Sequence, residues 1–394
     1  MHKIYKRLFG AAFLALTVVA LPIGQAMAEK VDLLTEKQVF SLGDYKTVSG
    51  ETIKDVKVGY ETYGTLNKDK SNAILIAHFF SGNSHAAGKY AAEDAKPGYW
   101  DNVIGAGKII DTNKYFVISS DTLVNLGVHN PKVITTGPAS INPETGKPYG
   151  LSFPLVTMED FVHVQKALVD SLGIKKLHGV AGASMGSLQT MTWAATYPDM
   201  VPRAMAVISP GASGHPYLIS MLKRWADVIK LDPNWQGGNY YGKDRPLKGL
   251  SLALQSVTLD AFQRPWVQKH DVKWADEKAN PAVEMKARYA VEKMLDDRGD
   301  ARAKGSDSNH FLYLVKANQS YDIREKIADI KAKFLFLPAE GDLIFPPSEA
   351  EAFAETLKKQ GNEVDLQVLK GPLGHINGIV FMPQAEAKIK KWLE

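Results

Sequence analysis

One short segment restricts the folds open to this chain more than any other. Gly182-Ala183-Ser184-Met185-Gly186 follows an apolar run, Leu177–Ala181, and opens a helical pattern over Met185–Tyr197. A serine between glycines at a strand-to-helix turn is typical of a nucleophile elbow, where small residues permit a strained turn that presents the hydroxyl. The helix that follows directs its N–H groups and dipole toward any negative charge developing there. The alternative from sequence is a tight turn in which Ser184 only caps the helix.

Apolar runs and helical patterns alternate along most of the chain. The runs that predict strands are Val56–Thr65, Ala73–His78, Tyr115–Ser120, Leu177–Ala181, Ala204–Ile208, Phe334–Leu337 and Val364–Leu369. Helices are predicted after Thr157, over Met185–Tyr197 and Ser348–Lys359, and near Gln384–Leu393. This alternation predicts an α/β fold with a mainly parallel central sheet covered by helices on both faces.

One region breaks the alternation. Between about Gly211 and Ile330 there are helical patterns, such as Tyr217–Ile229, and no convincing buried strand. We therefore expect residues 211–330 to form a helical cap (lid) inserted into a core made of residues 29–210 and 331–394.

The first 28 residues have the pattern of a secretory signal peptide. Lys3, Lys6 and Arg7 precede an apolar run of 14 residues, and Ala26-Met27-Ala28 supplies small residues for cleavage after Ala28. A run of this length is short for a membrane-spanning helix, which needs about 20 residues. The sequence thus predicts export to the periplasm or beyond, with no membrane anchor after cleavage.

Charge and cysteine content exclude several classes of protein. The chain has 47 basic and 43 acidic residues, and three of the basic ones lie in the predicted signal peptide, which leaves a net charge of +1 after cleavage. No basic field therefore remains to attract nucleic acid. The absence of cysteine excludes disulfides, thiolate zinc sites and cysteine nucleophiles.

A serine hydroxyl needs a base, and the base needs an orienting acid. In folds with a nucleophile elbow the chain order is serine, acid, histidine. Of the histidines that follow Ser184, only His375 comes after the last predicted strand, whereas His215, His270 and His310 fall in the predicted cap. Asp342, after the run Phe334–Leu337, is the predicted acid, and Glu340 is the alternative.

Two backbone N–H groups are expected to form an oxyanion hole. Met185, directly after the nucleophile, and Phe80, in the loop after Ala73–His78, are the predicted donors. No dinucleotide fingerprint, Walker loop or H-E-x-x-H motif is present. The sequence therefore predicts neither a cofactor nor a metal.

Ordered segments over nearly all of the chain resemble the homoserine O-acetyltransferase family of α/β-hydrolase-fold enzymes. Among them are VGYETYGTLN (58–67), TGPASINPETGKPYG (136–150), GASMGSLQTMTWAATYPDMV (182–201), DPNWQGGNYY (232–241) and GPLGH (371–375). The resemblance implies Ser184, Asp342 and His375 as the catalytic triad, with Phe80 and Met185 at the oxyanion hole. It also implies that the cap can carry a homodimer contact.

The same resemblance shows a departure in the cap. Family members hold the homoserine carboxylate with an arginine after G-L-x-x-A and a tyrosine seven residues later. Leu254 and Ala261 stand at those positions here, and Arg264 is a nearby substitute. The expected function is therefore hydrolysis of a small carboxylic ester with an uncharged, partly apolar group. The alternatives are an acyl-CoA-dependent O-acyltransferase and a non-catalytic binding protein.

Overall fold

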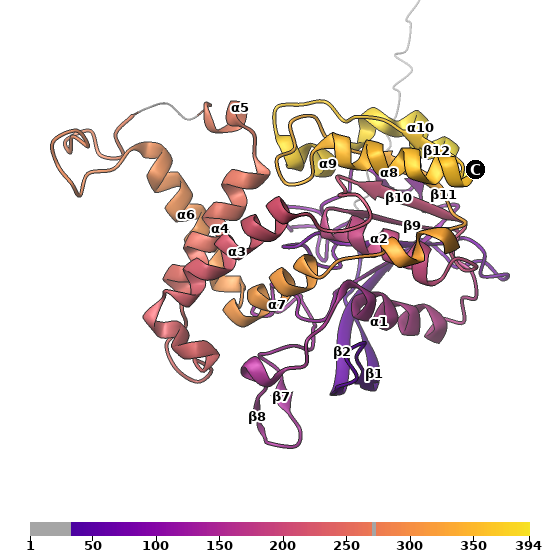
Figure 1. Cartoon of the computed structure of the whole chain (residues 1–394), viewed down its shortest axis with the longest axis horizontal. Coiled ribbons are helices and arrows are strands. Elements are labelled where there is room, and N and C mark those ends of the chain that lie inside the picture. Colours follow the sequence, from indigo (N-terminus) through magenta and orange to yellow (C-terminus); the bar gives the residue numbers. More distant parts are fainter. Residues whose placement is uncertain (1–32, 270–272) are drawn as a thin grey trace, which may run out of the picture. The chain divides into compact units, whose positions relative to one another are not determined.

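The computed structural model describes residues 33–269 and 273–394 (Figure 1). Eight strands form the central sheet in the order β1-β2-β6-β3-β9-β10-β11-β12. Their bounds are β1 (Gln38–Lys46), β2 (Thr52–Tyr63), β3 (Ala73–Ala77), β6 (Phe116–Ser120), β9 (Gly179–Ala183), β10 (Arg203–Val207), β11 (Lys333–Leu337) and β12 (Val364–Leu366). The hairpin β1–β2 and the pair β2–β6 are antiparallel, and the other pairs are parallel. The predicted mainly parallel sheet is confirmed.

Strand β9 differs from its predicted bounds in a way that matters for the site. It begins and ends two residues later than the apolar run Leu177–Ala181. Its pairing continues to Gly182 on β3 and to Ala183 on β10. The strand therefore ends immediately before Ser184.

Alternating side chains of the buried strands pack into two separate cores. On β3, Ala73 and Leu75 belong to one core, while Ile74 and Ile76 belong to the other. Helices α1 (Met158–Ser171), α2 (Met185–Thr196) and α8 (Pro347–Gln360) contribute to the first core, and α10 (Glu386–Leu393) contributes to the second. Both faces of the sheet are thus covered, as expected for a parallel sheet.

Shorter elements complete the part of the fold around the sheet. They are the strand pairs β4 (Ile104–Gly105) with β5 (Ile110–Asp111) and β7 (Ile141–Asn142) with β8 (Lys147–Pro148), and the short helix α9 (Asn377–Val380).

Helices follow one another between β10 and β11, where the sequence predicts the cap. They are α3 (Pro216–Lys230), α4 (Leu247–Ala261), α5 (Arg264–Val267), α6 (Ala290–Gly305) and α7 (Ser308–Gln319), and Figure 1 shows α3, α4 and α6 together beside the sheet. Buried residues of this region, such as Leu218, Leu250 and Phe311, belong to the same core as β3 and α2. The helices therefore pack against the sheet layers without a core of their own.

The predicted signal peptide lies outside the described residues. Within residues 33–269 and 273–394, no helix is both long enough and apolar enough to cross a membrane.

Candidate active site

Ser184 occupies a strained turn between β9 and α2. Its φ of 56° and ψ of −124° lie outside the regions that non-glycine residues ordinarily adopt. A Cβ atom on Gly182 would lie 2.3 Å from the carbonyl oxygen of Gly186, and one on Gly186 would lie 2.1 Å from that of Ala77. Both glycines are needed because the turn passes directly against backbone.

The interpretation of Ser184 as a simple helix cap does not fit this turn. Its side chain makes no capping hydrogen bond to α2. Instead, Ser184 Oγ lies 2.7 Å from Nε2 of His375, which is in the loop after β12.

His375 is held on its other side by Asp342, from the loop after β11. The distance between His375 Nδ1 and Asp342 Oδ2 is 2.6 Å. The second carboxylate oxygen, Oδ1, accepts hydrogen bonds from the backbone N–H groups of Ile344 and Phe345, at 2.8 and 3.0 Å. The alternative acid, Glu340, is exposed. All three side chains of the predicted triad are thus connected in the order serine, histidine, acid.

The hydrogen bonds fix which ring nitrogen of His375 can act as a base. An ionised carboxylate can only accept, so Asp342 requires a proton on Nδ1. The neutral ring then presents a free electron pair on Nε2 to the Ser184 hydroxyl. The arrangement can remove the serine proton and stabilise the imidazolium that forms.

The two predicted oxyanion donors come from different elements: Met185 from α2 and Phe80 from the loop after β3. Met185 is the first residue of α2, where a backbone N–H has no partner within its own helix. Phe80 lines the same cavity as Ser184, and its ring packs edge-on against Trp225 of α3 and Phe311 of α7, with centroids 5.9 and 5.1 Å apart. The cap helices therefore support the loop that carries the second predicted donor.

A buried histidine at the start of this loop supports it from the other side. His78 Nδ1 donates to the carbonyl of Phe79 (2.8 Å), and Nε2 accepts from Thr122 N–H (3.2 Å) and from Asn125 Nδ2 (3.1 Å). Burial lowers the pKa of His78, which agrees with this neutral form. Sequence reasoning missed the role, because the partners come from a different loop.

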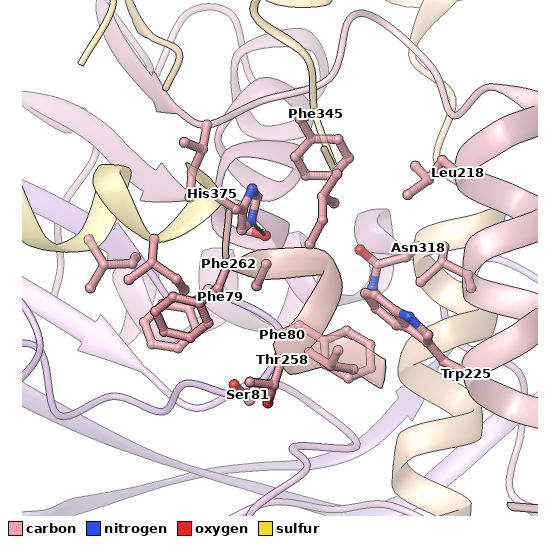
Figure 2. A pocket seen from close by; sticks show the side chains of 18 of the residues that line it. Phe79, Phe80, Ser81, Leu218, Trp225, Thr258, Phe262, Asn318, Phe345 and His375 are labelled. Atoms are coloured by element: carbon pink, nitrogen blue, oxygen red, sulfur yellow. Dashed lines mark hydrogen bonds between the residues drawn. The ribbon is translucent and has the colours of Figure 1, made fainter. Parts of the chain in front are cut away.

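A cavity of about 260 Å³ opens beside Ser184 and His375, between the sheet and the cap helices (Figure 2). Most of its wall is apolar, and Figure 2 shows Phe345 beside the ring of His375, with Phe79 and Phe262 also at the wall. Among the described residues that line it, none is Asp or Glu. The cavity thus offers no carboxylate to pair with an ammonium group.

Two arginines that the sequence analysis did not single out line this cavity. Arg298 and Arg302 both come from α6. Burial, and then the charge of Arg298, lowers the pKa of Arg302 to about 10, so the guanidinium stays protonated at neutral pH. Arg264, the predicted substitute, is exposed and does not line the cavity. The spacing of four residues between Arg298 and Arg302, which places them on one helix face, is the only sequence signal for this pair.

The other histidines downstream of Ser184 have different surroundings. His215 accepts from the N–H of Leu218 at the start of α3, with Nε2 2.9 Å from Glu349. His310 is buried and bonds Asn125 O and Ala139 N. His270 lies outside the described residues.

The fold and the hydrogen-bonded serine, histidine and aspartate define an α/β hydrolase. A sequence model of the α/β hydrolase fold family matches residues 114–377. The chain is 39% identical over 352 residues to a homoserine O-acetyltransferase of Methanosphaerula palustris, covering 88% of this chain and 70% of that protein.

Two solved structures resemble the described fold closely. The crystal structure of esterase E22 superposes with a TM-score of 0.88 at 44% identity, covering 92% of this chain and 100% of that one. Homoserine O-acetyltransferase from Bacillus anthracis superposes with a TM-score of 0.87 at 36% identity, covering 92% and 98%. The chain belongs to the homoserine O-acetyltransferase-like family of α/β hydrolases.

Proposed function

We propose that this protein is a serine-dependent carboxylic ester hydrolase that works through an acyl-enzyme. The observation that carries the proposal is His375, which bridges Ser184 at 2.7 Å and Asp342 at 2.6 Å. This geometry brings a nucleophile, a base and an orienting acid into one hydrogen-bonded line.

The chemistry follows from the roles of these groups. Ser184 Oγ attacks the ester carbonyl while His375 Nε2 takes its proton. The N–H groups of Phe80 and Met185 stabilise the oxyanion. His375 returns the proton to the departing alkoxide, which leaves the acyl group on Ser184. Water then attacks this acyl-enzyme with the same base, and the acid and free serine are released.

A homoserine O-acetyltransferase shares the acyl-enzyme but passes the acyl group to an amino acid. The relatives include homoserine O-acetyltransferases and an esterase, so the family alone does not decide between transfer and hydrolysis. The cavity supports hydrolysis, because none of its described lining residues is an acid that would hold the ammonium group of homoserine. Leu254, which stands where the resemblance expects an arginine, is buried in α4. A transferase must hold its acceptor well enough to compete with water at the acyl-enzyme.

We also propose export and a homodimer contact through the cap. Export favours hydrolysis, because acyl-CoA is a cytosolic polyanion that does not reach an exported enzyme, whereas water is always present. Support for export comes from the basic and apolar pattern of residues 1–28.

One assay separates the candidates. Purified protein beginning at Glu29 is given short to medium p-nitrophenyl esters and, separately, acetyl-CoA with homoserine. Ester turnover that disappears in Ser184→Ala, with no homoserine-dependent release of CoA, supports the hydrolase. Efficient CoA release with negligible ester hydrolysis supports the transferase, and the absence of both, with no labelling by a fluorophosphonate, supports a binding protein.

A further inference from the structure

The starting observation is a contact between the cap helices α6 and α4. Nη1 of Arg302 donates to the carbonyl of Leu254 at 3.2 Å and to Oγ1 of Thr258 at 2.9 Å. Leu254 occupies the position where the family resemblance expects an arginine on α4. The guanidinium of Arg302 therefore reaches that position from the neighbouring helix.

In the part of the chain that the structure describes, neither Arg298 nor Arg302 has a carboxylate within 4.0 Å. Two nearby acids of α6 pair elsewhere, Asp296 with Arg288 and Asp297 with Lys293, and Asp300 lies within 4.0 Å of neither arginine nitrogen among the described residues. Two like charges are thus kept one helical turn apart. Arg298 is exposed, so solvent screens its charge, whereas Arg302 is partly buried against the cavity and is the group that gains most from an anion.

Contacts with described residues hold both guanidinium groups in place, and those of Arg302 leave part of its donors uncommitted. Arg298 lies over the rings of Trp266 and Phe262, 5.3 and 5.9 Å from their centroids. The two hydrogen bonds of Arg302 both use Nη1, so its Nη2 and Nε donors are not committed to them. A planar guanidinium with free donors suits a carboxylate, which it can bind through two parallel hydrogen bonds.

From these contacts we infer that Arg302 and Arg298 form an anion subsite, which selects esters carrying a carboxylate away from the scissile bond. This inference rests on the proposed hydrolase function and replaces the expectation of an uncharged substrate. Ser184 and His375 line the same cavity as the two arginines, so one small molecule can reach both. Thr258 also lines the cavity; its hydroxyl accepts from Arg302 and donates to the carbonyl of Leu254 at 2.8 Å, so it helps to hold the guanidinium in place.

The carboxylate can belong to either half of the ester, and two pairs of substrates distinguish the halves. The first pair is the acetate ester of γ-hydroxybutyrate and that of γ-hydroxybutyramide, with the charge on the alcohol part. The second pair is monomethyl adipate and its terminal amide, with the charge on the acyl part. The two esters of each pair differ by one charge and have nearly the same size.

The measured quantity is the ratio of kcat/KM for the anionic ester to that for its amide. We expect a preference of about 10- to 100-fold for the anion in at least one pair, because a hydrogen bond to a charged group contributes a factor of about that size. Arg302→Gln lowers that ratio at least tenfold, Arg298→Gln lowers it less, and Arg302→Lys retains part of it. Lys304→Gln removes one positive charge from the exposed face of the same helix and leaves the ratio unchanged.

A second measurement does not depend on the folding of the variants. Free γ-hydroxybutyrate or adipate should compete with a neutral p-nitrophenyl ester in the wild-type enzyme, and the corresponding amides should not. Neutral ester turnover with a ratio near one in both pairs and no inhibition by the free carboxylates would overturn the subsite and leave the hydrolase standing. A preference that survives in both Arg302→Gln and Arg298→Gln would also overturn it. If the wild-type enzyme does not hydrolyse the neutral ester at all, the proposed function is contradicted instead.

Discussion

Ser184 Oγ and His375 Nε2 lie 2.7 Å apart although 191 residues separate them in the chain. Ser184 follows β9 at the centre of the sheet, and His375 comes from the loop after the edge strand β12. The carboxyl ends of parallel strands meet at one edge of a sheet, and this shared edge brings the two residues together.

Asp342→Asn should reduce ester turnover far more than it reduces folding. An amide presents an N–H where the carboxylate accepts, so His375 is driven toward the tautomer that lacks a free electron pair on Nε2. We expect kcat to fall on the order of 10⁴-fold, as in other triads of this kind, with KM little changed. Steady-state kinetics on a p-nitrophenyl ester measures this, and Glu340→Gln is the matched control. A larger loss of activity in Glu340→Gln than in Asp342→Asn would identify Glu340, not Asp342, as the acid of the triad.

Gly186→Ala should destabilise the elbow. The added Cβ would lie 2.1 Å from the carbonyl oxygen of Ala77, so β3 and α2 must separate. We expect a loss of more than about 2 kcal/mol in the free energy of unfolding, with much reduced activity. Gly305→Ala is the control, since a Cβ there has no heavy atom within 4 Å. Equal unfolding midpoints in denaturant for both variants would contradict the tight packing of the turn.

His78→Ala should lower turnover through the loop that carries Phe80. The substitution removes hydrogen bonds to Phe79, Thr122 and Asn125 and leaves buried groups unpaired, at a cost of about 1–3 kcal/mol each. Because a displaced oxyanion donor affects the transition state, kcat should fall about 10- to 100-fold with a smaller change in KM. An unchanged kcat in a destabilised but folded variant would show a purely structural role for His78.

Asp307 should make the stability of the fold depend on pH in the acid range. Burial alone would raise its pKa, but hydrogen bonds with His129, His310 and the Tyr240 hydroxyl lower it to about 2, below the ordinary value of 3.8. The stabilisation is therefore complete above about pH 4 and is lost as the pH falls toward 2.

Asp307→Asn tests that dependence. The difference between the two pKa values corresponds to about 2 kcal/mol at neutral pH. The stability gap between the wild type and the variant should shrink between pH 4 and 2, as followed by urea unfolding across that range. A gap that stays constant with pH would contradict the lowered pKa.

Local signals in the sequence predicted most of the fold and the central residues of the site. The elbow and the apolar runs depend on neighbours in the chain, so Ser184 and the central strands could be located directly. Asp342 and His375 followed from the order of strands, because each lies in the loop after one. The end of strand β9 at Ala183 depends on pairing with its neighbours in the sheet, so the hydropathy pattern alone places it two residues too early.

Residues whose roles depend on packing between distant segments were not found. Which face of α6 meets α4 is decided by tertiary contacts, so no local signal places Arg302 beside Leu254. Nearness in the chain favours Arg264 as the substitute, yet Arg264 is exposed. Two hydrogen-bond partners of His78 come from the loop after β6, so no local sequence signal predicts these contacts either.

The central claim is that Ser184 is the nucleophile, and covalent labelling tests it most directly. The wild-type protein and Ser184→Ala are incubated with a fluorophosphonate, and the adduct is located by peptide mass spectrometry. We predict a single adduct on Ser184 in the wild type, none in the variant, and a loss of ester turnover on the order of 10⁴–10⁶-fold in the folded variant. An adduct on another residue, or equal labelling of Ser184→Ala, would contradict the account.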